Sequence, residues 1–141
     1  MRRWRECSGW LLASLGMLLT TAVAADELRF TVTRVEEVRS FQSYDGFELA
    51  PLARSAEVNV RLNRLEGRIK QHVHPHTDHF LYVIKGQVEL TVGDDVHMIG
   101  AGHFVTIPRG VSHAMQRLGE SEALFLDVAA PPDVGDVIWQ E

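Results

Sequence analysis

Histidines gather at one place in this 141-residue chain: four of its seven lie in residues 72–79, the run HVHPHTDH. His72 and His74 are two residues apart, and residues i and i+2 of a strand project from the same face, so both imidazoles can face one metal ion. His79 follows a proline-containing turn and can point back toward that pair, and His113 comes after a second turn. The pattern predicts a metal site, against the alternative of a solvated polar loop that is rich in histidine by chance.

The other polar residues near this cluster are expected to have mainly structural roles. His76, in the turn, is predicted to be exposed or to support a ligand, and His97 to be a surface residue. Asp78 is expected to solvate the turn or to orient an imidazole, since metal-bound histidines usually donate their other N–H to an oxygen. Arg109 is expected to be a solvated turn residue or to meet an anionic substrate. The sequence contains no Ser-His-Asp order, phosphate-binding loop or paired-carboxylate signature.

Short strands must hold these histidines in place. Segments rich in β-branched and apolar residues alternate with Gly, Pro and Asp turns at roughly ten-residue spacing, which is typical of an all-β sandwich or barrel. No long segment has a helical period of 3.6 residues. We see no repeat or second domain, and we expect residues 129–141 to form an exit loop and tail. The predicted strands cover residues 28–35, 57–62, 68–74, 80–84, 87–92, 104–107 and 123–128.

The first 24 residues have the pattern of a secretory signal peptide. Residues 1–6 (MRRWRE) are basic, residues 9–19 are apolar, and Ala22-Val23-Ala24 is a small-residue cleavage site. The alternative, a membrane anchor, needs about 20 apolar residues. A twin-arginine signal is a weaker alternative. We therefore expect cleavage after Ala24 or Ala25, a mature domain over 25–141 that is periplasmic or secreted, and no stable membrane insertion after cleavage.

Length and charge narrow the function classes. The chain has one domain's worth of residues and a net charge of −5. Removal of residues 1–24 takes away three Arg and one Glu, so the mature charge is 11 − 18 = −7. Without a basic patch or stripe, a nucleic-acid binder is not expected. The single cysteine, Cys7, leaves with the signal peptide, so no disulfide is expected in the mature domain.

Two motifs resemble those of the cupin superfamily. The first cupin motif is a His-x-His pair followed by a Glu and a Gly at fixed spacing, and here the order is His72, His74, His79 and Gly86. The second runs from a Gly through Pro-x-Gly and His to an Asn, and here the order is Gly102, Pro108-Arg109-Gly110, His113 and Arg117. His79 thus replaces the usual Glu, and Arg117 the usual Asn. The resemblance covers residues 72–117 and implies a double-stranded β-helix, also called a jelly-roll or cupin barrel.

The resemblance also implies a ligand set for one divalent transition metal. Either His72, His74, His79 and His113 all bind the ion, or three of them bind it and His79 stands off. Nitrogen-rich sites suit Fe, Cu, Ni or Zn, while Mn stays possible. Because neutral imidazoles do not compensate the charge of the ion, an anionic substrate or a hydroxide would bind it well.

Three kinds of function are compatible with these motifs. The resemblance favours a metal-dependent, dioxygenase-like oxidoreductase acting on a small organic molecule. The alternatives are a non-catalytic binder of a small molecule or metal, and a sugar-type isomerase. Residues 80–84 (FLYVI) are apolar on both faces and should be covered on both, and cupins commonly pair their barrels, so a homodimer is expected.

Overall fold

The structure is a computed structural model that describes residues 28–133, 135 and 137–140. The predicted signal peptide, residues 1–24, lies outside the described residues. Strands dominate the described chain, and its one helix is a single 3-10 turn, η1 (Val35–Glu37). That helix is neither long nor apolar enough to span a membrane. The strands are β1 (Gln42–Tyr44), β2 (Phe47–Arg54), β3 (Asn59–Leu65), β4 (Arg68–Val73), β5 (Asp78–Lys85), β6 (Gln87–Val92), β7 (Asp95–Gly100), β8 (Phe104–Ile107), β9 (His113–Leu118), β10 (Ala123–Ala130) and β11 (Ile138–Trp139).

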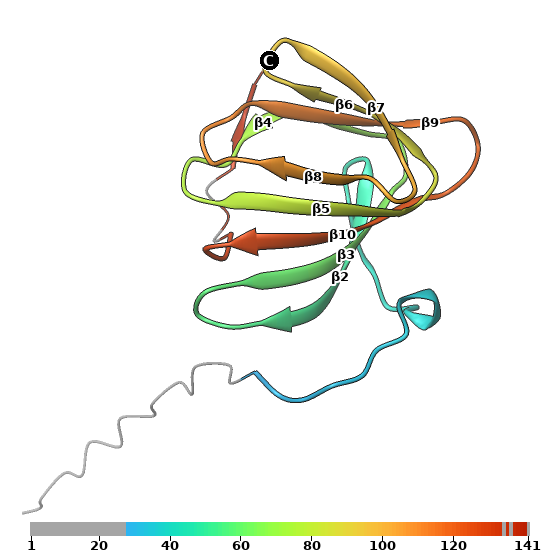
Figure 1. The fold of residues 1–141 in the computed structure, drawn as a ribbon, viewed down its shortest axis with the longest axis vertical. Helices are drawn as coiled ribbons and strands as arrows, with labels where there is room; N and C mark the ends of the chain where they lie inside the picture. Colours follow the sequence, from blue (N-terminus) through green and yellow to red (C-terminus); the bar gives the residue numbers. More distant parts are fainter. Residues whose placement is uncertain (1–27, 134, 136, 141) are drawn as a thin grey trace, which may run out of the picture.

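These strands form two antiparallel sheets. One has the order β1-β2-β3-β10-β5-β8, and the other the order β11-β4-β9-β6-β7. Figure 1 shows β2, β3, β10 and β5 side by side in the first sheet, with segments far apart in the sequence next to each other. This arrangement confirms the predicted all-β, double-stranded β-helix.

Two-residue alternation determines which side chains enter the space between the sheets. In β6, Val88 and Leu90 are buried, whereas Glu89 between them is more exposed. The same alternation on β5 points Leu81 and Val83 inward. Burying one such side chain stabilises the folded state by about 1.5–3 kcal/mol relative to leaving it exposed. Both sheets contribute to the resulting core, which consists of Leu65, Ile69, Leu81, Val83, Val88, Leu90, Ile99, Ile107, Met115, Ala123 and Phe125.

The predicted strand over residues 28–35 is wrong. Residues 28–34 have no strand pairing in the described chain, and Phe30 is 95% exposed. Strand-forming side chains do not make a strand unless a neighbouring strand accepts their backbone hydrogen bonds. Residues that follow instead pack onto the first sheet, where Val35, Val38 and Phe41 contact a second apolar cluster of Ala50, Leu62 and Leu124.

Five strands, β1, β2, β7, β9 and β11, match none of the predicted strand ranges. β2 contains Pro51, which cannot donate a backbone hydrogen bond and so argues against a central strand. The structure accommodates it because the neighbouring β1 pairs only with Phe47–Leu49 and ends before the proline. The expected exit loop also contains a strand, since Ile138 and Trp139 pair with the end of β4.

Gly86 is the single residue that joins β5 to β6, and these strands belong to different sheets. Its φ is +81°, and a Cβ atom would lie 2.3 Å from the carbonyl oxygen of Glu122. Glycine avoids both the strain and the clash. Gly86 follows the last residue of β5, whereas His79 is near the first residue of that strand. This turn and His79 therefore lie at opposite ends of β5.

Candidate metal centre

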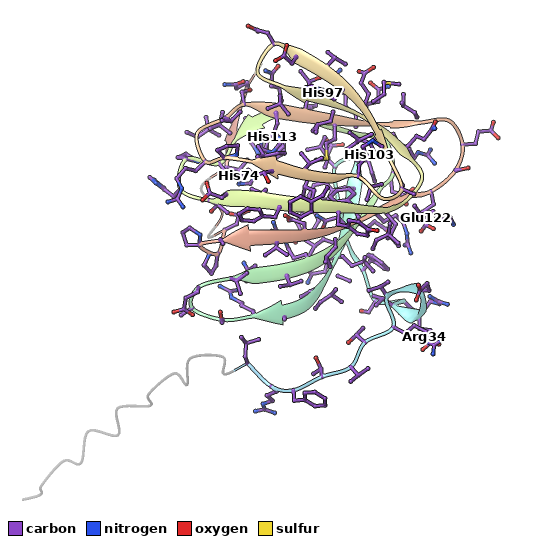
Figure 2. The ribbon with its side chains drawn as sticks, in the orientation of Figure 1. Arg34, His74, His97, His103, His113 and Glu122 are labelled. Carbon is purple, nitrogen blue, oxygen red and sulfur yellow. The ribbon has the colours of Figure 1, made fainter. Side chains whose placement is uncertain are left out.

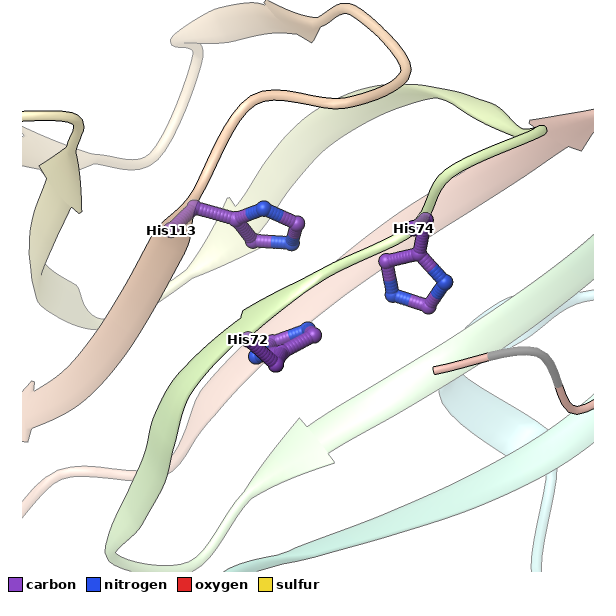
Figure 3. Close-up of side chains that lie close together, drawn as sticks. All are labelled: His72, His74 and His113. Atoms are coloured by element: carbon purple, nitrogen blue, oxygen red, sulfur yellow. The ribbon is translucent and has the colours of Figure 1, made fainter. Parts of the chain in front are cut away.

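Three strands bring four histidines together between the sheets. His72 lies on β4 and His74 directly after it, His79 on β5 and His113 at the start of β9. Figure 3 shows His72, His74 and His113 with their rings turned toward one another. One ring nitrogen from each of these three lies within 4.8 Å of the others, and all four side chains are buried. The structure thus brings together the histidines that the two sequence motifs predicted.

A β-bulge turns the first pair inward. On β9, Met115 and His113 are two residues apart, but their partners on β4, Ile69 and His72, are three apart. The extra residue shifts the alternation, so Ile69, His72 and His74 are all buried. Bulges often re-aim side chains next to functional sites. A regular β4 would place His72 on the opposite face from Ile69.

In three of the four histidines, one ring nitrogen lies within hydrogen-bond distance of an oxygen acceptor. The Nδ1 of His72 lies 2.7 Å from the Lys70 carbonyl oxygen, and the Nδ1 of His113 lies 3.0 Å from that of Val111. The Nδ1 of His79 lies 2.9 Å from Oδ1 of Asp127. An N–H at Nδ1 leaves Nε2 as the nitrogen with a free lone pair, which is the state that a metal ligand needs.

His74 and His79 form a second candidate group with Asp133. In this group, too, each pair of ligand atoms lies within 4.8 Å, and the rings of His74 and His79 are 4.2 Å apart. Oδ2 of Asp133 is 3.5 Å from Nδ1 of His74. Within the described residues, His74 Nδ1 and His79 Nε2 are buried without a hydrogen-bond partner. His74 belongs to both groups, so the four imidazoles form one continuous cluster.

The electrostatics of the cluster favour neutral rings. Burial lowers the pKa of His113 to about 3, and charge repulsion from His72 acts in the same direction. Burial and repulsion from His79 lower the pKa of His74 to about 4. Burial also lowers the pKa of His72. The lone pairs of these imidazoles are therefore available near neutral pH.

A buried carboxylate supports His79. Asp127 on β10 accepts hydrogen bonds from His79 at Oδ1 and from Nε and Nη2 of Arg61 at Oδ2. Burial alone would raise the pKa of this carboxyl, but the hydrogen bond from His79 and the charge of Arg61 hold the pKa below its ordinary value. Arg61, Asp127 and Asp133 were not among the predicted site residues. The only sequence feature that could have indicated such residues is a charged residue in an otherwise apolar strand, such as the Asp in ALFLDVAA.

The remaining predicted residues lie away from the rings. His76 is exposed, and so is His97, which lies on β7 (Figure 2), whereas His74 and His113 are buried. Asp78 accepts hydrogen bonds from the backbone and guanidinium of Arg109 in an exposed ion pair. Asp78 therefore supports the turn, as expected, and does not hydrogen-bond an imidazole. Tyr82 is 45% exposed, so within a single copy of the described chain residues 80–84 are not covered on both faces.

A cavity of about 530 Å³ reaches the cluster from the space between the sheets. This volume suits a small organic ligand. Trp139 of β11 also lines it and lies 5.0 Å, ring to ring, from His72. The four histidines line its polar end together with Asp127 and Asp133, and its walls are mainly apolar, including Leu49, Ile69, Leu81, Ile107, Met115 and Phe125.

The donor set fits a divalent transition metal. Buried neutral imidazoles with unpartnered nitrogens are ligands for Fe, Ni, Cu or Zn rather than for Mg or Ca, which prefer oxygen. His72, His74 and His113 would hold the ion, with His79 as a fourth donor. Such an ion would supply Lewis acidity or, for Fe and Cu, one-electron redox chemistry at the polar end of the cavity.

Known proteins resemble this chain in sequence and in structure. A curated relative, protein SchB from Streptomyces halstedii, is 32% identical over 93 residues, which are 63% of this chain and 67% of SchB. The polyketide synthase CurC from Streptomyces cyaneus is 26% identical over 122 residues, 79% of each protein. Among solved structures, an uncharacterised conserved protein with a double-stranded β-helix domain from Klebsiella pneumoniae is 26% identical. Its TM-score is 0.68, and the match covers 80% of this chain and 99% of that one.

The cupin domain family matches residues 60–129. This range contains the four clustered histidines, Arg61 and Asp127, whereas Asp133 and Trp139 come from the tail beyond it. The family match, the double-stranded β-helix domain of the Klebsiella pneumoniae protein and the two antiparallel sheets lead to the same assignment. The chain belongs to the cupin family.

Proposed function

We propose that this protein is a metal-dependent enzyme that acts on a small organic molecule held in the cavity. One observation carries the proposal: four buried imidazoles from three strands form the polar end of a mainly apolar cavity. Two of their ring nitrogens, Nδ1 of His74 and Nε2 of His79, are buried without a hydrogen-bond partner, which is costly, and metal coordination would recover part of that cost. The apolar walls would bind the carbon skeleton of the substrate, and the polar end would bind its oxygens.

The activity we favour is oxidation of the dioxygenase type. The nitrogen-rich donor set is compatible with the redox-active ions Fe and Cu. The described residues lining the polar end also include two carboxylates, Asp127 and Asp133, that can accept hydrogen bonds. Asp133 comes from the tail, which places an oxygen acceptor beside His74.

A second candidate is ring closure or isomerisation of a carbonyl-rich substrate without oxidation. The relative CurC, which matches over 79% of both chains, is named a polyketide synthase, and this name supports a carbonyl-rich class of substrate. In this reaction the ion would act only as a Lewis acid, so Zn or Ni would serve as well as Fe. The two candidates therefore differ in their need for dioxygen.

We also propose that the protein is exported and forms a homodimer. Export rests on the basic, apolar and small-residue order of residues 1–24. The homodimer rests on an apolar pair on the outer face of the first sheet, where Tyr82 and Phe104 are register partners that are 45% and 64% exposed. Because β8 is the edge strand of that sheet, a second copy can cover this pair. N-terminal sequencing of the exported protein should begin at Ala25 or Asp26, and retention of Met1 would contradict export.

The metal is tested first, by measuring the metal content of purified protein from cells grown with mixed metals. We expect a bound transition metal in the wild type and a large loss in His72→Ala and His113→Ala. His97→Ala is the matched control, because this histidine is exposed on β7, and it should keep its metal. Full occupancy in His72→Ala and His113→Ala would exclude the motif histidines as ligands.

The reaction class is tested with catechols and 1,3-dicarbonyl compounds, since both can chelate a divalent ion through two oxygens. Oxygen consumption in an oxygen electrode, coupled to loss of the compound, supports oxidation. Conversion that proceeds equally well without dioxygen supports the second candidate. Metal-loaded protein that binds such compounds but converts none of them would contradict both and leave a binding role.

A further inference from the structure

Asp127 is the only acidic side chain that is buried among the described residues, with 2% of its surface exposed. It lies on β10 opposite Leu81 of β5 and Arg61 of β3, and it lines the cavity. A buried carboxylate is costly unless charged or hydrogen-bonding partners compensate for it. Neither of the two cupin motifs contains this residue, so the motifs do not explain why a carboxylate lies buried at this place in the barrel.

The two oxygens of Asp127 have different partners. Oδ2 accepts from Nε of Arg61 at 3.0 Å and from Nη2 at 2.5 Å. Arg61 itself is held further by Asp133, 3.6 Å from its Nη1. Oδ1 accepts from Nδ1 of His79 at 2.9 Å. Because both guanidinium donors bind Oδ2, Oδ1 is left to accept the hydrogen bond from His79.

This arrangement determines where the proton of His79 lies. A carboxylate paired with arginine is ionised and can only accept hydrogen bonds, so Nδ1 of His79 must donate. In a neutral ring the proton is then absent from Nε2. That nitrogen is buried and has no hydrogen-bond partner among the described residues. The His79 ring lies 4.2 Å from the ring of His74 and 6.2 Å from that of His113.

We propose that Asp127, held by Arg61, is a positioning residue that keeps His79 protonated at Nδ1 and presents its Nε2 lone pair to the metal. The inference rests on the proposed metal site and adds a role for a residue outside the two motifs. It also accounts for the missing carboxylate of the first motif. His79 occupies the Glu position, and Asp127 places a negative charge directly behind the imidazole, which raises the basicity of the ligand.

The first experiment needs no metal. Long-range ¹H–¹⁵N spectra of the histidine rings in the metal-free protein, at a pH where the ring is neutral, show which nitrogen carries the proton. We expect His79 to be protonated at Nδ1 in the wild type and to shift toward Nε2 protonation in Asp127→Asn. Nε2 protonation of His79 in the wild type overturns the proposal, and this result can be obtained even if Asp127→Asn does not fold.

The second experiment titrates the full protein with Co²⁺ and records its visible absorption. Loss of a hydrogen-bonding partner of a metal ligand typically lowers affinity about 10–100-fold, which we expect for Asp127→Asn together with a changed cobalt spectrum. Asp78→Asn is the matched control, because that aspartate is next to His79 in sequence but forms an exposed pair with Arg109. Its affinity and spectrum should equal those of the wild type.

The outcomes separate this inference from the proposed function. If wild type and Asp127→Asn bind Co²⁺ with equal affinity and identical spectra, Asp127 does not position a ligand, although the metal site stands. If the wild type binds no cobalt, the proposed function fails. In that case Nδ1 protonation of His79 would show a structural hydrogen bond only, and the positioning role toward a metal would fall with the site.

Discussion

Acidification tests whether the clustered imidazoles are neutral in the folded, metal-free protein. The pKa of His113 is lowered to about 3 and that of His74 to about 4, mainly by burial. In the unfolded chain both return to an ordinary value of about 6.5. Between pH 6.5 and these folded values the unfolded state binds more protons than the folded state. The free energy of unfolding must therefore fall as the pH falls through this window.

The magnitude follows from the same values. Each histidine changes the free energy of unfolding by about 1.4 kcal/mol per pH unit inside its window. From pH 7 to pH 5 the effective interval is about 1.5 units, so each contributes about 2 kcal/mol and the pair about 4 kcal/mol. His72, whose pKa is also lowered, acts in the same direction. Carboxylates titrate mainly below this interval, so the histidines dominate the change.

Urea unfolding of the metal-free protein, followed by circular dichroism at pH 7 and pH 5, measures this change. In His113→Gln the difference between the two pH values should shrink by about 2 kcal/mol, because glutamine does not titrate. His97→Gln, which alters an exposed histidine, should keep the full difference. Equal stability at pH 7 and pH 5 would refute the reasoning. A difference in stability between pH 7 and pH 5 that is undiminished in His113→Gln would refute it as well.

Four further predictions concern the metal, the core and the interface. Zn²⁺ at 100 times its Kd should raise the free energy of unfolding by about 2.7 kcal/mol, measured by urea titration at pH 7; no increase would contradict binding to the folded state. His79→Glu should still bind metal but shift its preference toward Mn, measured as metal content after growth with mixed metals. Leu62→Ala should cost about 2–5 kcal/mol in the same urea assay, since this side chain is fully buried beneath Val35, Val38 and Phe41. Tyr82→Glu should convert the proposed dimer to a monomer in light scattering, because it puts a charge into the apolar pair with Phe104; a monomeric wild type would contradict the dimer.

The sequence predicted most accurately those features that a local residue pattern defines. The predicted strands 87–92 and 104–107 agree with β6 and β8, because alternation and flanking turns fully define these short segments. The motif spacing also identified His72, His74 and His113, which lie within ligand distance of one another. The four-histidine set remains a prediction, because His79 groups with His74 and Asp133 instead of completing the three-histidine group.

Other features depend on contacts that a sequence pattern does not contain. The bulge that turns His72 inward is visible only in the pairing of β4 with β9. Asp127 reaches His79 because β10 lies beside β5, 48 residues away along the chain. Asp133 lies in a segment interpreted as an exit loop, yet it approaches His74. Such residues are recognised only after the sheet order is known.

The central claim is that the motif histidines hold one transition-metal ion inside the barrel. A crystal structure of the metal-loaded protein, with data collected at the absorption edge of that metal, tests it most directly. We expect one strong anomalous peak, at about 2.0–2.2 Å from a nitrogen of each of His72, His74 and His113. A position within bonding distance of Nε2 of His79 would establish the fourth ligand. An anomalous map with no peak at these rings, or with the ion bound elsewhere on the protein, would contradict the account.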